Sequence, residues 1–170
     1  MAYGIFEAEG NAAGVAQAIG NIGRSYGRLG DLPRAERAAA LNNLAYLLAL
    51  EGSPESLAEA DAHSESAYDL APMLLAVRST RAFVLQRLGR AEEALWLTED
   101  HRYRLEANSM RAEVLCTAAL AYAQLGKTAA ADASIEEAER LAADDTVVIR
   151  TRDAIVRSSG EIGATQNAAG

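Results

Sequence analysis

The stretch "LQRLGRAEEAL", residues 85–95, decides the fold class of this chain. It holds a Leu-Gly pair with an alanine five residues after the glycine, and the same phrase recurs as "LGDLPRA" at 29–35 and "LGKTAAA" at 125–131. A Leu-Gly pair that closes an apolar-periodic run is typical of a helix C-terminus, because glycine adopts the left-handed conformation there without strain. The recurrence predicts a helix-turn-helix unit that repeats along the chain.

The spacing of the turn glycines supports this repeat. Gly52, Gly89 and Gly126 are separated by 37 residues in each step, and Gly30 begins the series. Each glycine has a small residue seven positions before it: Gly23, Ala45, Ala82 and Ala119. Small residues at these positions allow two antiparallel helices to cross closely, whereas larger side chains would hold the helix axes apart.

The composition indicates an all-α protein. Hydrophobic residues make up 50% of the chain but aromatic residues only 5%, and there are three prolines in all. The apolar content is mostly Ala and Leu, which favour helices, and the residue types that strands prefer are sparse. The pattern predicts helices over 11–28, 33–50, 54–71, 73–88, 91–105, 108–125, 128–143 and 146–158.

These repeats resemble the tetratricopeptide repeat (TPR), a pair of antiparallel helices with small residues at fixed positions. The second repeat supplies Ala45, Ala60, Ala67 and Pro72 at the positions that the family pattern marks as small or proline. The fourth supplies Ala119, Tyr122, Gly126, Ala131 and Ala138. The resemblance covers about residues 16–145, in about four repeats. It implies a right-handed α-α superhelix, a solenoid built from helix pairs.

Two of the repeats depart from the family pattern. In the third, Arg81 stands where leucine is usual and His101 takes a position where a small residue is usual. The first is too short, because only 22 residues separate Gly30 from Gly52. The helix predicted over 33–50, with Asp31 as its N-cap and Pro33 near its first turn, therefore serves two repeats at once.

The predicted domain organisation has three parts. Residues 1–10 form an N-terminal extension, and residues 11–158 form the helical repeat domain. The helix at 146–158 is expected to cap the last repeat with a polar outer face. Residues 159–170 are small, polar and rich in glycine, which favours a disordered tail.

Charge and cysteine usage exclude several classes of function. The net charge is −8, and such an acidic chain repels the phosphate backbone, so no nucleic-acid partner is expected. Cys116 is the only cysteine, which excludes an intrachain disulfide and a thiolate metal cluster and favours a core position. The two histidines, His63 and His101, have no second ligand at metal-binding spacing. We therefore expect no metal, no cofactor and no enzyme activity.

The chain also has no apolar run of the ~18 residues that a membrane span needs, and no signal peptide is evident at its start. We expect no membrane partner and a cytoplasmic location. All but one of the 16 basic residues are arginine, which indicates a GC-rich bacterial genome.

The resemblance implies a concave groove lined by the first helix of each repeat. Carried over to this sequence, the groove residues are Gln17, Arg24, Arg28, Asn42, Tyr46, Ser79, Phe83, Gln86, Arg87, Glu113 and Gln124, and the same carry-over gives Cys116 and Leu120 in the fourth repeat. Amide and guanidinium donors around two aromatic rings suit an extended peptide, whose backbone and carboxylates they can bind. The alternative is an ordinary solvated face with both rings in the core.

Two further features offer other kinds of interface. No basic residue occurs between Arg37 and Arg78, so the acidic side chains of that stretch could meet a basic partner or simply face water. Gly20 and Gly27 fall near one face of the helix predicted at 11–28 and could admit a second helix. The first hypothesis for function is therefore a non-catalytic adaptor that binds a peptide or partner helix. The alternative is a structural homo-oligomer that associates through its N-terminal helix.

Overall fold

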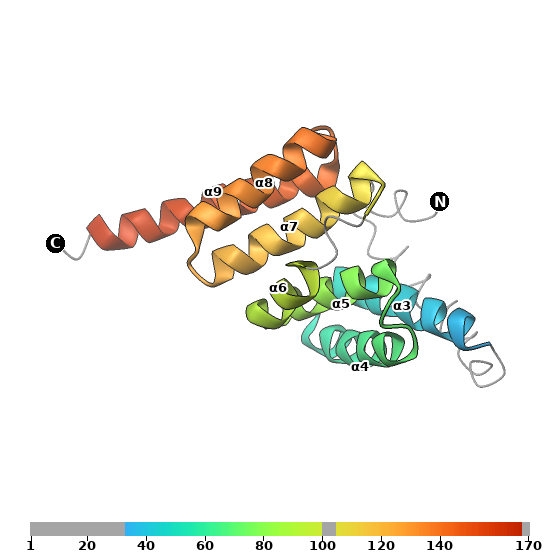
Figure 1. Cartoon of the computed structure of the whole chain (residues 1–170). Helices are drawn as coiled ribbons and strands as arrows, with labels where there is room; N and C mark the ends of the chain where they lie inside the picture. The colour runs from blue at the N-terminus through green and yellow to red at the C-terminus, as the bar shows by residue number, and fades with distance from the viewer. Residues whose placement is uncertain (1–32, 100–104, 168–170) are drawn as a thin grey trace. The chain divides into compact units, whose positions relative to one another are not determined.

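The computed structural model describes residues 33–99 and 105–167, and every regular element in these residues is an α-helix (Figure 1). The all-α prediction is confirmed for this part of the chain. The helix predicted at 11–28 lies outside the described residues, and so does Asp31, the predicted N-cap of the helix at 33–50. None of the described helices is both long and apolar enough to cross a membrane.

The chain divides into two compact units, Met1–Leu88 and Gly89–Gly170. In its described part the first unit holds α3 (Arg34–Glu51), α4 (Pro54–Leu70) and α5 (Leu75–Arg87). The second unit holds α6 (Ala91–Glu99), α7 (Asn108–Gln124), α8 (Thr128–Ala142) and α9 (Thr146–Asn167). The sequence predicted one repeat domain over 11–158, whereas the structure groups the helices into these two units.

The three turn glycines of the described chain have the predicted backbone conformation. Gly52, Gly89 and Gly126 have φ angles of 76°, 75° and 69°, in the left-handed region that L side chains rarely adopt. The Gly52 N–H closes the last turn of α3 by donating to the carbonyl of Leu48 at 3.1 Å. The turn glycines therefore end helices for the physical reason expected from the sequence.

Side chains that satisfy helix ends help to join α3 to α4. The Ser53 hydroxyl oxygen caps α4 by accepting a hydrogen bond from the Ser56 N–H at 3.1 Å, and Pro54 occupies the first turn. At the other end of α4, the Arg34 side chain donates to the carbonyls of Leu70 at 2.8 Å and Asp69 at 3.3 Å. An arginine at this position also matches the negative end of the helix dipole.

The core of the first unit lies where α3, α4 and α5 meet. Ala45 and Ala60, two of the small positions of the repeat, are completely buried in one cluster with Leu44, Leu48, Ala49 and Val84. Helix α5 packs against both α3 and α4. The small residues thus lie in the interface between helices, as the repeat pattern predicted.

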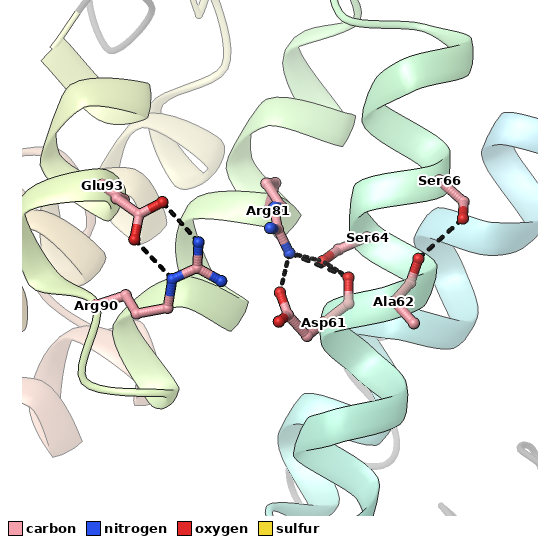
Figure 2. Close-up of polar contacts among 7 residues, drawn as sticks. All are labelled: Asp61, Ala62, Ser64, Ser66, Arg81, Arg90 and Glu93. Carbon is pink, nitrogen blue, oxygen red and sulfur yellow. Dashed lines mark hydrogen bonds and ion pairs between the residues drawn. The ribbon is translucent and has the colours of Figure 1, made fainter.

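Arg81 replaces a core leucine of the repeat pattern, and the structure shows what holds it (Figure 2). Its side chain reaches from α5 to α4 and is almost completely buried, with 8% of the residue exposed. One terminal nitrogen donates to the Asp61 carbonyl at 3.0 Å, to the Ser64 hydroxyl at 2.8 Å and to the Asp61 carboxylate. These bonds satisfy a charged group that the dry interior would otherwise exclude.

The second unit repeats this arrangement, because α9 packs against both α7 and α8 as α5 packs against α3 and α4. The small positions Ala119 and Ala138 are completely buried in a cluster that also contains Val148 and Ile155 of α9. Two ion pairs link the same helices: Arg111 with Glu137 at 2.7 Å, and Arg152 with Glu139. Helix α9 therefore covers the last helix pair, as a capping element should.

Helix α9 differs from its prediction in length and in its outer face. It continues to Asn167, through residues expected to form a disordered tail from 159 onward. Glycines at 160 and 163 weaken a helix, but no proline interrupts it. The outer face is also less polar than predicted, because Ile149 is 48% exposed and Val156 is 61% exposed.

Candidate functional site

The structure brings together a pair of predicted groove residues from two helices of the first unit. Tyr46 lies on α3 and Phe83 on α5, and their ring centroids are 5.6 Å apart with the planes tilted by 44°. Both residues are half-buried, so they are neither fully exposed groove residues nor fully buried core residues. Phe83 packs against the core cluster of the unit, and both residues remain partly exposed to solvent. Half-buried aromatic rings of this kind can anchor a bound chain.

Asn42 lies one helical turn before Tyr46 and so shares its side of α3. Its Oδ1 atom is buried and accepts no hydrogen bond from the described residues, although the residue as a whole is half-buried. A buried acceptor without a donor costs about 1–3 kcal/mol relative to one that is paired. This atom would gain from a donor supplied by a bound molecule.

Helix α5 contributes two more predicted groove residues at helical spacing from Phe83. Ser79 is half-buried, and its hydroxyl donates to the Leu75 carbonyl of its own helix at 2.9 Å. Gln86 is more deeply buried than a groove residue should be, with 6% exposed. Asn42, Tyr46, Ser79, Phe83 and Gln86 are called the α3–α5 face below.

Arg87, which the repeat register placed in the groove, is engaged elsewhere. Its guanidinium lies against the backbone of Gly52, at the turn between α3 and α4, so closely that a Cβ on that glycine would overlap it. The long arginine side chain reaches back to the C-terminal end of α3, where a positive charge is favoured. The structure thus places the Arg87 guanidinium beside this turn, and its role in the groove stays a prediction.

The predicted groove residues of α7 belong to the second unit. Glu113 and Gln124 are exposed on α7 of that unit. Cys116 lies in the core cluster of the second unit, which corrects its assignment to the groove, and Leu120 is partly buried and packs against that cluster. Burial raises the pKa of the Cys116 thiol from its ordinary 9.0 to about 12, against the opposing effect of a hydrogen bond with Thr151.

Several predicted residues lie outside the described part of the chain. These are the groove residues Gln17, Arg24 and Arg28 and the glycines Gly20 and Gly27 proposed for self-association.

The acidic stretch forms the exposed side of α4. Glu55, Glu59, Glu65 and Asp69 are all exposed, whereas Asp61 pairs with Arg81. His63 on the same helix is half-buried, and burial lowers the pKa of its imidazole while the nearby Glu59 carboxylate opposes this effect. No three His, Cys, Asp or Glu side chains in residues 33–99 and 105–167 are grouped so that they could hold a metal ion.

One large exposed residue, Trp96, is not among the site residues predicted from the sequence. Trp96 on α6 is 64% exposed, although tryptophan is usually well buried. The signal was available in the helical period of α6, because the buried residues Ala91, Ala94, Leu95 and Thr98 leave position 96 on the opposite side. Comparison with known proteins adds no further assignment: no family model, no curated protein and no solved structure matches this chain.

Proposed function

We propose that this chain is a non-catalytic interaction scaffold that binds an extended peptide or a partner helix on the α3–α5 face. The observation that carries the proposal is the contact between Tyr46 and Phe83 across two helices. Each ring is fixed by its own helix and remains partly open, so a ligand side chain can pack on both without reorganising them. Preformed aromatic anchors of this kind contribute most of the affinity at many protein interfaces.

The buried Oδ1 of Asn42 supports the same proposal. A peptide lying along the aromatic pair would bring backbone N–H groups to α3, and one of them could donate to this oxygen once the Asn42 side chain turned outward, since the atom is buried in the free chain. Main-chain hydrogen bonds of this kind would give affinity for an extended chain, and the aromatic contacts would give selectivity for an apolar or aromatic ligand residue.

The architecture that we propose is a TPR-like right-handed superhelix. The support is the recurrence of one packing arrangement, in which α5 lies on α3 and α4 as α9 lies on α7 and α8, together with the left-handed turn glycines. The adaptor function, the cytoplasmic location and the bacterial source belong to the same proposal. They follow from the repeat resemblance, the acidic composition and the arginine usage.

A selected peptide tests the proposed site. Phage-displayed random peptides would be selected on the full chain, and the dissociation constant of the best one would be measured by fluorescence anisotropy. Tyr46→Ala and Phe83→Ala are each expected to weaken binding about 30-fold, the effect of losing roughly 2 kcal/mol at an aromatic anchor. Asn42→Ala is expected to weaken it about 5- to 30-fold, through one buried hydrogen bond.

Matched controls separate the site from general destabilisation. Asn43→Ala removes the same side chain from the next position around α3, and Tyr122→Ala removes another half-buried tyrosine, on α7. Both controls should stay within about twofold of the original affinity. If Asn42→Ala and Asn43→Ala weaken binding equally, or if Tyr46→Ala leaves it unchanged, the α3–α5 face is not the binding site.

A further inference from the structure

The exposed side of α6 combines a large aromatic ring with carboxylates. Trp96 lies between Glu92 and Glu93 on the preceding turn and Glu99 on the following one, and all four residues are exposed. Glu93 is already held by Arg90, whose guanidinium donates to both carboxylate oxygens at 2.6 Å (Figure 2). The carboxylates of Glu92 and Glu99 therefore set the charge on the two sides of the indole ring.

The exposed side of α9 has the complementary chemistry. Ile149 and Val156 stand two turns apart and form an exposed aliphatic pair. Arginines flank the pair on both sides: Arg150 and Arg157 on one, and Arg152, which also pairs with Glu139, on the other. Asp153 is the only acidic residue among them between Thr146 and Arg157. This basic surface is unusual on a chain with a net charge of −8.

We propose that α6 of one molecule binds α9 of a second copy of this chain. The indole ring of Trp96 would pack on Ile149 and Val156, and the arginines of α9 would meet Glu92 and Glu99. Arginine suits this contact because its planar guanidinium both pairs with carboxylates and stacks on an aromatic ring. The charge complementarity selects a second copy as the occupant, since an acidic aromatic face and a basic aliphatic face occur on the same molecule.

The exposed acidic side of α4 is a weaker candidate for the same partner. It offers Glu55, Glu59, Glu65 and Asp69, but none of the large exposed hydrophobic residues lies on α4. Charge alone in an exposed setting contributes little and is screened by salt. Trp96 is therefore the feature that favours α6 over α4 as the surface that binds α9.

The contact uses two different surfaces, so it is heterologous. Helix α6 packs on α7, and α9 packs on α7 and α8, so neither exposed side takes part in the packing just described. A molecule bound through its α6 face still presents its own α9 face to another copy. Such contacts extend into chains unless the rotation closes them into a ring. This inference is independent of peptide binding at the α3–α5 face.

The test uses light scattering behind size exclusion on the full chain over a concentration series. The expected result is a weight-average mass that rises above the 18.0 kDa of one chain at low salt and falls back when ionic strength is raised about tenfold. Trp96 is the only tryptophan, so its emission should shift to shorter wavelength as the mass rises. A mass that stays at 18.0 kDa across the whole series overturns the proposal.

Charge reversal identifies the surfaces. The variants E92R/E99R and R150E/R157E should each be monomeric alone, because like charges then face each other. An equal mixture of the two should associate again, because each reversed face finds an opposite partner. The control E55R/E59R makes the same charge change on α4 and should still associate, as should Tyr46→Ala on the α3–α5 face. Loss of association in the α4 control, or a mixture that stays monomeric, contradicts the proposed contact.

Discussion

The buried Arg81–Asp61 pair gives a prediction in which two variants of one ion pair have unequal costs. Asp61→Ala leaves the guanidinium of Arg81 in the interior without its carboxylate. Arg81→Leu removes the buried charge and installs the residue that is usual in the repeat. We expect the first change to destabilise the protein much more than the second, because an uncompensated buried charge is costly whereas an exposed carboxylate is not.

The magnitude follows from the surroundings of the two side chains. Removing one partner of a fully buried pair costs about 3–5 kcal/mol. The side chain of Arg81 is 9% exposed and that of Asp61 is 32% exposed, so water already reaches the carboxylate. Arg81 would also keep two neutral acceptors, the Asp61 carbonyl and the Ser64 hydroxyl. We therefore expect about 2–3 kcal/mol for Asp61→Ala and about 0–1 kcal/mol for Arg81→Leu.

Urea unfolding followed by circular dichroism measures both costs. With a denaturant dependence of about 1–3 kcal/mol per molar urea, Asp61→Ala should lower the midpoint by about 1–2 M while Arg81→Leu lowers it little. The double variant Asp61→Ala/Arg81→Leu should be about as stable as Arg81→Leu alone, because the uncompensated charge is then absent. Equal losses in the two single variants, or a larger loss in Arg81→Leu, would refute the reasoning.

Two further predictions concern the turn glycines and the buried thiol of Cys116. Alanine at Gly52, Gly89 or Gly126 should cost about 1–2 kcal/mol, because an L residue is strained in the left-handed region. At Gly52 the new Cβ also meets the end of the flexible Arg87 side chain, which can move aside, so the cost there should be similar. Urea midpoints that are unchanged by these substitutions would contradict this. Cys116 should resist alkylation in the folded protein, and rapid alkylation of the native protein at pH 8 would contradict its burial. The free energy of unfolding should fall as pH rises from 9.0 toward about 12, because the thiol ionises in that range only in the unfolded protein.

The helices and turns of the described chain could be predicted because their signals are local. Glycine at a helix end acts within a few residues, and the bounds of α3, α4 and α8 lie close to the predicted ones. The small residues at the crossings were also found, since their positions depend only on the repeat register. Ala45 and Ala119 are both completely buried.

The candidate site was predictable only in part, because the register gives the side of a helix and not what lies opposite it. Tyr46 and Phe83 meet as the register implied. The core position expected for Cys116 is confirmed, whereas its assignment to the groove is wrong, because α9 covers that part of α7 with Val148 and Ile155 in the same core cluster. The contact of the Arg87 guanidinium with the Gly52 turn could not be read from the register, because a long flexible side chain can reach the end of a neighbouring helix.

The sequence by itself determined that this part of the chain is helical, where its helices turn, and which small residues lie at the crossings. Those properties depend on backbone preference and helical period, which act over a few residues. Only the tertiary structure decided that Arg81 finds Asp61 and Ser64 across two helices, and that Trp96 and Val156 stay exposed. Each of these outcomes depends on which helices pack together, and residues distant in the sequence set that packing.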